Sequence, residues 1–313
     1  MIDGREVVVS CSIGFALYPQ HGTAKEALLR AADTAQYHAK ESRNSWQAYR
    51  PEMQEWRPAT PGLSALRQAL EQHQLTVHYQ PIVSLDTGAV HAVEALVRWP
   101  HASGPVAPAD IVTLAETSGL IAPLTEYVMR AAIRQMHDWD AELGATQLRV
   151  AINISAVQVS GGGLLSMVER VLEESGFDPR RLDLELTERA AMRASPSAIA
   201  ALEALRARGI TLTLDDFGTG YSALSRLERL PMDAMKIDKS FLERIEVEGN
   251  GVIARAIIAM GRALEMAIVG EGVENEAQLD FLRRSGCEYA QGFLLARPAH
   301  AGSITELLRA AGR

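Results

Sequence analysis

The sequence predicts an α/β protein whose simplest architecture is a closed (β/α)8, TIM-like barrel. Short apolar runs typical of buried strands alternate with longer segments in which apolar residues recur at three- and four-residue spacing. These strand–helix units repeat over about 230 residues, which is enough chain for a parallel barrel. A doubly wound open sheet is the alternative, but no GxGxxG fingerprint follows a predicted strand.

The individual elements follow from local pattern. Strands are expected at residues 7–10, 75–82, 93–99, 148–155, 182–186, 211–214, 234–237, 267–269 and 289–294. The clearest helical patterns are at residues 126–143, 196–208, 252–264 and 276–285. Pro179 and Pro196 are typical helix starts, because proline lacks the N–H that the first helical turn leaves unbonded.

The N-terminal segment has a different pattern. A β-hairpin-like run at residues 7–19 precedes an amphipathic helix at 27–44. One strand pair and one helix bury too little apolar surface to fold well alone. The predicted organisation is a small strand/helix segment (1–50), a proline-containing linker (51–62) with its boundary near Pro58, and a barrel domain (63–313).

Composition narrows the possible functions. The formal net charge of −8 argues against binding of polymeric DNA or RNA, which needs a basic face. An acidic protein that acts on an anionic substrate needs local positive charge, and bound metal is its simplest source. Cys11 and Cys287 form no CxxC pattern, so two free thiols in a reducing cytoplasm are expected.

No membrane segment is expected. The N-terminus has no apolar core behind a basic start, so no signal peptide is predicted. The longest uncharged run, residues 150–168, contains Asn153, Gln158 and three consecutive glycines. It indicates a strand, a loop and a helix start rather than a transmembrane span, so a cytoplasmic chain is expected.

Residues 211–224 are the most informative stretch. A strand of alternating Thr and Leu ends in two adjacent carboxylates, Asp215 and Asp216, and a loop with Gly218 and Gly220 follows. Adjacent acids at the end of a buried strand repel each other, and a dication between them removes that cost. One aspartate can then bridge two metals while its neighbour holds the second. Taken alone, the pair also fits an Asp-capped turn.

Every predicted barrel strand carries a polar side chain in or directly after an apolar run, at the end where barrels place their chemistry. In chain order these are Gln80, Glu94 and Arg98, Asn153, Glu185 and Glu188, Asp215 and Asp216, Lys236, Glu271 and Glu274, and Gln291. Singly, each has a structural explanation, such as a core amide, an ion pair or a turn. Together they place many carboxylates around one lysine, and metal ions balance that charge. Oxygen ligands without His or Cys favour Mg²⁺ or Mn²⁺ over Zn²⁺.

These residues fall in motifs that resemble the EAL family of cyclic di-GMP phosphodiesterases, from about Leu63 to the end of the chain. The motifs are EALVRW (94–99), NIS (153–155), ELTE (185–188), DDFGTGYSAL (215–224), KID (236–238), EGVE (271–274) and QGF (291–293). The ordered set is specific, whereas the EAL triplet alone is not. The resemblance implies a barrel whose first strand is antiparallel to the rest, and hydrolysis of cyclic di-GMP to linear pGpG.

The resemblance also implies roles for matching positions. The first metal would be held by Glu94, Asn153, Glu185 and Asp215, and the second by Asp215, Asp216 and Glu271. Lys236 would contact the attacking water and, with Glu94 and Glu271, form the catalytic set. Two Mg²⁺ or Mn²⁺ ions are expected, and Ca²⁺ is expected to inhibit because it is larger and accepts looser geometry.

Further positions match substrate contacts and loop support. The implied substrate contacts are Gln80, Leu96, Arg98, Asp238 and Gln291, and the implied support for the loop after the Asp pair is Glu188, Phe217, Gly218, Thr219, Gly220 and Glu274. Among them, the guanidinium of Arg98 suits a phosphate.

The N-terminal SCSIGFALYP and AADTAQYHAK resemble the last strands and helix of a GGDEF diguanylate cyclase domain. The GGDEF signature is absent, so no cyclase activity is expected. The segment lacks a core of its own, so we expect it to be poorly ordered or to pack elsewhere, for example on a second copy. The family resemblance further predicts a homodimer.

Two other functions stay open. One is a catalytically silent cyclic di-GMP receptor, and the other is a structural barrel with unused motifs. Degenerate family members lose metal ligands or the loop after the Asp pair, whereas this chain keeps both. An active phosphodiesterase is therefore favoured.

Overall fold

The computed structural model describes residues 13–25, 27–28, 31–32, 34–35, 46–51, 53, 61–101, 104–144, 146–218, 224–243, 245 and 251–311. The chain divides into two compact units, Met1–Thr60 with His101–Pro105, and Pro61–Pro100 with Val106–Arg313. No helix within the described ranges is both long and apolar enough to cross a lipid bilayer.

The smaller unit contains a two-stranded sheet. Strand β1 (Ile13–Phe15) pairs in parallel with β2 (Trp46–Ala48), so Ile13 lies opposite Trp46. Parallel strands need a crossover rather than a tight turn, and the described residues among 25–35 are helical. The described part of the hairpin predicted at residues 7–19 contains β1, which pairs with β2, whereas the other arm of that hairpin lies outside the described residues. The strand predicted at 7–10 and the boundary at Pro58 lie outside the described residues.

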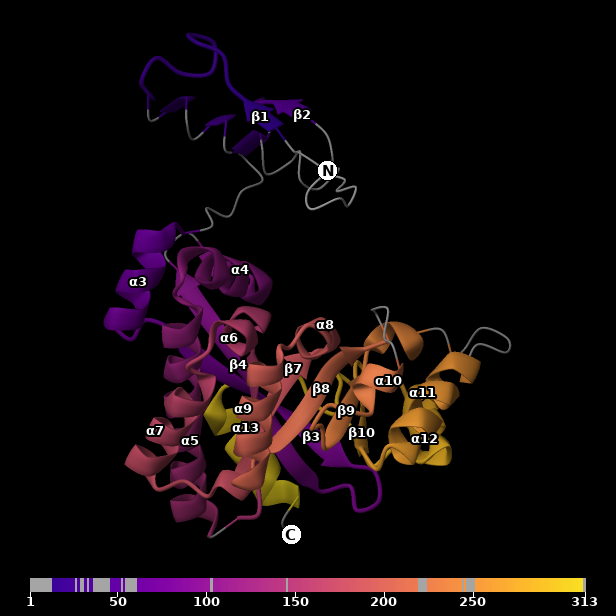
Figure 1. Ribbon diagram of the computed structural model, residues 1–313. Helices are drawn as coiled ribbons and strands as arrows, with labels where there is room; N and C mark the ends of the chain where they lie inside the picture. The colour runs from indigo at the N-terminus through magenta and orange to yellow at the C-terminus, as the bar shows by residue number, and fades with distance from the viewer. Residues whose placement is uncertain are drawn as a thin grey trace. The chain divides into compact units, whose positions relative to one another are not determined.

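The larger unit is a closed eight-stranded barrel (Figure 1). Its strands are β3 (Thr76–Ser84), β4 (Val90–His101), β6 (Arg149–Ile154), β7 (Leu182–Thr187), β8 (Thr211–Phe217), β9 (Ala234–Ile237), β10 (Ala267–Gly270) and β11 (Tyr289–Ala290). They pair in the order β3-β11-β10-β9-β8-β7-β6-β4, and β4 closes the ring on β3. β3 is antiparallel to both neighbours and the other pairs are parallel. The predicted barrel with an antiparallel first strand is confirmed, and the open sheet is excluded.

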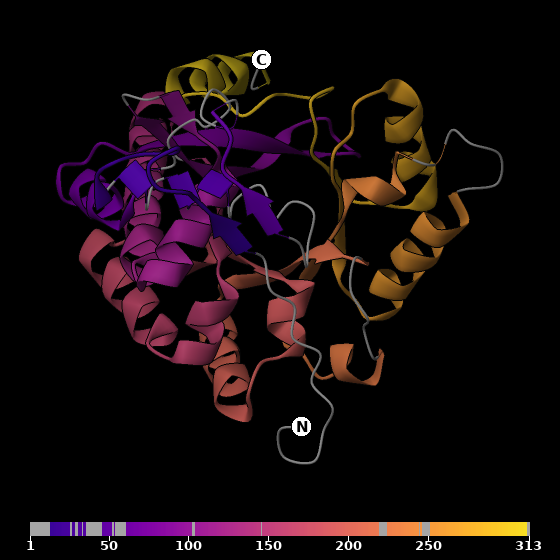
Figure 2. The same ribbon diagram turned by 90° about the horizontal axis from the view of Figure 1, so that it is seen from above.

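Helices surround the ring of strands, as the view from above shows (Figure 2). They are α3 (Leu63–Glu71), α4 (Pro108–Ser118), α5 (Ile121–Leu143), α6 (Ala156–Gly161), α7 (Leu164–Ser175), α8 (Glu188–Met192), α9 (Pro196–Ala207), α10 (Leu224–Leu227), α11 (Gly251–Ala263), α12 (Glu276–Ser285) and α13 (Ala301–Ala311). Shorter elements are β5 (Gly104–Val106), η1 (Pro179–Arg181) and η2 (Lys239–Phe241). The four predicted helices are present, although α5 begins at Ile121 rather than at residue 126.

Local capping begins two of these helices just beyond the strand ends. Ser155, directly after β6, and Asn275, after β10, each form a capping box with a glutamine three residues later. Each box satisfies N–H groups that the helix leaves unbonded, so the chain turns outward at the carboxyl end of the strand. Pro196 begins a full helix as predicted, whereas Pro179 begins only the three-residue η1.

The last barrel strand is shorter than predicted. It was expected at residues 289–294, but β11 ends at Ala290. Beyond it, Gln291 accepts a hydrogen bond from the Val273 N–H, and a Cβ at Gly292 would lie 2.2 Å from the Val273 backbone. This close approach of two backbones turns the chain away from the ladder. Gln291 therefore lies at the barrel mouth rather than within the sheet.

A buried hydrogen bond joins α13 to the longest helix, α5. The Trp139 Nε1–H donates to Thr305 Oγ1 at 2.9 Å, and Thr305 in turn donates to the Ala301 carbonyl at 3.0 Å. The Trp139 ring also packs edge-on against Tyr79 of β3, with ring centroids 5.1 Å apart. These contacts anchor the antiparallel strand that closes the barrel.

Thr305→Val keeps the shape of the side chain but leaves the buried Trp139 N–H without an acceptor. We expect a loss of about 1–3 kcal/mol in the free energy of unfolding, measured by urea denaturation. Thr117→Val is the matched control, because Thr117 also donates to the carbonyl four residues earlier but is exposed and accepts nothing from Trp139. Equal losses in the two variants would contradict the anchoring role.

Candidate active site

One buried lysine lies at the centre of a cluster of carboxylates. Lys236 is on β9 and only 1% of its side chain is exposed. Its Nζ lies 2.7 Å from Glu271 Oε1, 3.1 Å from Glu185 Oε1, 3.4 Å from Glu94 Oε2 and 3.5 Å from Asp215 Oδ1. The acids come from three different strands, β4, β7 and β8, and from the residue directly after β10. The barrel topology therefore brings residues from separate sequence motifs to one ammonium group.

The cluster holds more negative charge than Lys236 balances. Burial raises the pKa of Glu185 well above its ordinary value, because an ionised carboxylate loses its hydration there. Burial also raises the pKa of Glu271, to about 7. Burial alone would raise the pKa of Glu94 as well, but Lys236, Gln291 and Asn153 hold it below its ordinary value. The surplus negative charge favours the binding of a further cation.

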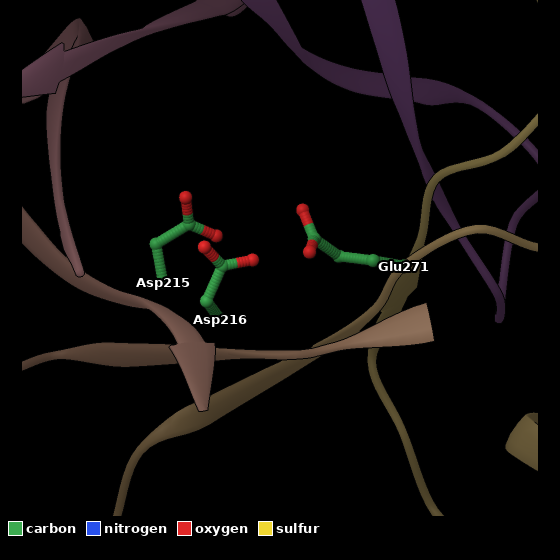
Figure 3. Close-up of side chains that lie close together, drawn as sticks. All are labelled: Asp215, Asp216 and Glu271. Atoms are coloured by element: carbon green, nitrogen blue, oxygen red, sulfur yellow. The ribbon is translucent and has the colours of Figure 1, made fainter. Parts of the chain in front are cut away.

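A backbone irregularity places the two adjacent aspartates on one side of β8. Successive side chains of a regular strand point to opposite faces. In β8 the pairing register with β9 shifts between Leu214 and Phe217, and Asp216 has a left-handed φ of 54°. Asp215, Asp216 and Glu271 consequently offer carboxylate oxygens within 4.8 Å of one another, and their side chains converge in Figure 3.

Convergence has an electrostatic cost. The pKa of Asp216 is raised to about 6, chiefly by burial and then by the charge of Asp215. A non-glycine residue with positive φ also stores backbone strain, which persists only where the surrounding structure enforces it. The protein thus holds three acids together against both repulsion and strain.

Three amide side chains orient Glu94. Asn153 Nδ2 donates to Glu94 Oε1 at 2.7 Å, and Gln291 Nε2 donates to Glu94 Oε2 at 2.8 Å. Gln291 Nε2 also lies 3.1 Å from Gln80 Oε1, and Gln80 is directly opposite Glu94 in the β3–β4 register. Gln80 donates in turn to the Ala296 carbonyl at 3.1 Å. The amides fix the Glu94 carboxylate at the mouth of the barrel.

The donor set fits divalent metal ions. Among the described residues, no donor forms a hydrogen bond with either buried oxygen of Glu185 or with Asp215 Oδ1, although Lys236 Nζ makes ion-pair contacts with Glu185 Oε1 and Asp215 Oδ1. A buried carboxylate oxygen that accepts no hydrogen bond is costly, and the one ammonium of Lys236 is shared among four carboxylates, so these atoms favour a further cation. Oxygen-only ligands suit hard ions such as Mg²⁺ and Mn²⁺. Asp215, Asp216 and Glu271 form an acidic cluster of the kind that holds a metal.

A cavity of about 290 Å³ opens over this cluster. Its lining consists of Gln80, Glu94, Asp216, Asp238, Lys239, Glu271, Gly272, Glu274, Gln291, Gly292 and Phe293. Of the predicted substrate contacts, Leu96 and Arg98 are not among these lining residues. Both share a face of β4 with Glu94, and Arg98 is half-buried and donates to the Val97 carbonyl at 2.9 Å.

The predicted loop-support residues have different surroundings. Glu188 Oε2 accepts a hydrogen bond of 2.8 Å from the Gly218 N–H, directly beyond the Asp pair. Phe217 is buried in the core, whereas the Glu274 side chain is exposed. Thr219 and Gly220, together with Tyr221, lie outside the described residues.

His78 is a neighbour of the site that the sequence reasoning missed. It lies on β3 opposite Leu96, on the same face as Gln80, and its ring centroid is 4.0 Å from that of His300. Its pKa is lowered, first by burial and then by His300 and Arg98. Residues two apart in a strand share a face, so the position of His78 two residues before Gln80 in a predicted strand could have identified it as a neighbour of the site.

Comparison with known proteins agrees with this geometry. The sequence model of the EAL domain family matches residues 63–298. The chain belongs to the EAL domain family. Two relatives from Pseudomonas aeruginosa are the bifunctional diguanylate cyclase/cyclic di-GMP phosphodiesterase MucR, 43% identical over 307 residues, and the cyclic di-GMP phosphodiesterase NbdA, 42% identical over 315 residues.

The extent of these matches differs between sequences and structures. The alignments cover 97% and 99% of this EAL protein but only 45% of MucR and 40% of NbdA, so the chain spans less than half the length of either. The solved structure of the PaMucR phosphodiesterase in its c-di-GMP complex has a TM-score of 0.73 and 44% identity. That similarity covers 77% of this chain and 98% of the solved one.

Lys236 should stabilise the barrel most strongly when no metal is bound. Lys236→Met leaves the buried acids without their cation, so we expect about 3–5 kcal/mol less free energy of unfolding in EDTA. Added Mg²⁺ should return part of that loss because it supplies positive charge. Urea denaturation with and without Mg²⁺ measures both effects.

Lys239→Met is the matched control, because the same change three residues away removes an exposed ammonium. Equal stability of the two variants in EDTA would show that Lys236 does not neutralise the carboxylate cluster.

Proposed function

We propose that this EAL domain hydrolyses cyclic di-GMP to linear pGpG. The observation that carries the proposal is the convergence of Asp215, Asp216 and Glu271, beside Lys236, at the mouth of an EAL barrel. In the reaction, water adds to one phosphorus, one P–O3′ bond breaks, and the released 3′-oxygen takes up a proton. The names of MucR and NbdA support this assignment.

Two divalent metals, Mg²⁺ or Mn²⁺, belong to the proposal. When bound, such a pair lowers the pKa of a water molecule and stabilises the charge on the phosphoryl oxygens. Glu94, Asn153, Glu185 and Asp215 would hold one ion, and Asp215, Asp216 and Glu271 the other. The buried carboxylate of Glu185, which accepts no hydrogen bond among the described residues and shares Lys236 with three other acids, supports this set. Ca²⁺ should bind with looser geometry and inhibit.

The remaining polar residues position water and substrate in this proposal. We assign Lys236 to hold the attacking water and to stabilise its charge once ionised. Arg98 would bind a phosphate, since the chain carries a net charge of −8 and the anionic substrate needs local positive charge. The proposed contacts with the nucleotide are Gln80, Leu96, Asp238 and Gln291.

The family resemblance extends the proposal to the whole chain. Residues 1–50 would be the end of a GGDEF-like domain without cyclase activity, 51–62 a linker, and 63–313 the phosphodiesterase barrel. We propose a cytoplasmic homodimer, and sedimentation velocity tests it, because a monomer at every concentration would contradict it.

The direct test is chromatography of cyclic di-GMP incubated with the purified chain in Mg²⁺, Mn²⁺, Ca²⁺ or EDTA. We expect pGpG only with Mg²⁺ or Mn²⁺. Glu94→Gln removes a proposed metal ligand. Loss of a residue that only orients a ligand can lower activity roughly 100-fold, so loss of the ligand itself should lower the rate at least as much.

Glu276→Gln provides the matched control, because Glu276 is an exposed acid on α12 away from the cluster. It should keep the wild-type rate. Binding of cyclic di-GMP without turnover in all four conditions would instead favour a receptor. Full activity of Glu94→Gln would contradict the assigned ligand set.

A further inference from the structure

The short turn η2 emerges between the two strand ends that carry Asp216 and Glu271. It follows β9 directly, and β9 lies between β8 and β10 in the barrel. Asp216 is on β8, and Glu271 follows β10 by one residue. The turn is therefore placed to contact the backbone next to both acids.

On the β8 side, η2 contacts the chain through Phe241. A Cβ built on Gly218 would lie 2.6 Å from Phe241 Cε2 and 3.2 Å from Ile257 Cδ1. Gly218 has a φ of 100°, a conformation that favours glycine. The Phe241 ring thus packs onto bare backbone two residues after Asp216, at the same residue whose N–H donates to Glu188.

On the β10 side, the contact comes from Lys239. A Cβ on Gly272 would lie 2.3 Å from Lys239 Cβ, and Gly272 has a φ of 66°. Gly272 directly follows Glu271. Each end of η2 therefore packs against a left-handed glycine one or two residues after one of the acids, and neither glycine has room for a side chain.

The turn itself is held firmly. The Asp238 side chain accepts a hydrogen bond of 3.0 Å from the Ser240 N–H, and the Asp238 carbonyl accepts one of 3.1 Å from Phe241. Leu242, the next residue, is fully buried, and its carbonyl accepts a hydrogen bond from Gln278 of α12. Because the turn is fixed at three points, its size can set the separation of the segments on either side.

We propose that η2 is a spacer that sets the separation of Asp216 and Glu271, with Phe241 and Lys239 Cβ as positioning residues for the second metal. The strained φ of Asp216 needs contacts that enforce it, and the Phe241–Gly218 contact is one of them. This inference rests on the proposed two-metal function, because it concerns the ligands of the second ion.

The test is a Mn²⁺-binding isotherm followed by electron paramagnetic resonance of the free ion, without substrate. The wild type should bind two Mn²⁺ ions. Phe241→Ala should weaken one site about 10- to 100-fold, the range typical for loss of a group that orients metal ligands, and leave the other unchanged. Phe241→Leu retains bulk over Gly218 and should restore most of the affinity.

Lys239 offers a sharper pair of variants. Lys239→Ala removes the ammonium but keeps the Cβ that contacts Gly272, so both Mn²⁺ sites should stay at wild-type affinity. Lys239→Gly removes the Cβ and should weaken the same site as Phe241→Ala. This pair decides the question if Phe241→Ala does not fold.

Phe177→Ala controls for general loss of packing. Phe177 is a buried aromatic residue that packs edge-on against His137, with ring centroids 5.7 Å apart, away from the acids. Its removal should lower the melting temperature without changing either Mn²⁺ site.

If the wild type binds two Mn²⁺ ions and both sites keep their affinity in Phe241→Ala and Lys239→Gly, the spacer proposal is wrong but the two-metal proposal stands. Equal weakening of both sites in Phe241→Ala and Phe177→Ala would also overturn the spacer alone. A wild type that binds fewer than two Mn²⁺ ions would overturn the two-metal proposal, and the spacer with it.

Discussion

The buried negative charge around Lys236 is the constraint on which the rest of the site depends. Four carboxylates lie within 3.5 Å of its Nζ, and the lysine itself is almost completely buried. Like charges at this depth repel strongly, because the interior screens them poorly. A barrel can hold them only if its strands are fixed by packing elsewhere, as α5 and α13 fix β3.

The carboxyl end of β8 departs from regular strand geometry, and this departure positions two of the acids. The register shift in β8 and the left-handed Asp216 bring two adjacent acids to one side, which a regular strand forbids. Glu188 then binds the Gly218 N–H, and η2 packs between Gly218 and Gly272. The geometry of the acidic cluster is thus a property of the backbone and its packing as much as of the acids.

Much of this organisation could be predicted from the sequence, for physical reasons that differ between residues. The alternation of strand and helix patterns predicted the barrel. The polar residues Glu94, Glu185 and Lys236 lie in predicted barrel strands, and we expected them to meet because such barrels place their chemistry at one end. The turn after Ala290 was not predictable, because it depends on the approach of Gly292 to the Val273 backbone. Likewise, Phe241 and Lys239 belong to no acidic motif, and only their three-dimensional contacts connect them to the site.

The most direct test of the two-metal assignment is anomalous diffraction from crystals of the wild-type domain grown with Mn²⁺. We expect two anomalous peaks about 3.5–4 Å apart, with Asp215 in contact with both and Asp216 and Glu271 in contact with one of them. A single peak, or no peak with Lys236 Nζ still in contact with all four carboxylates, would contradict it.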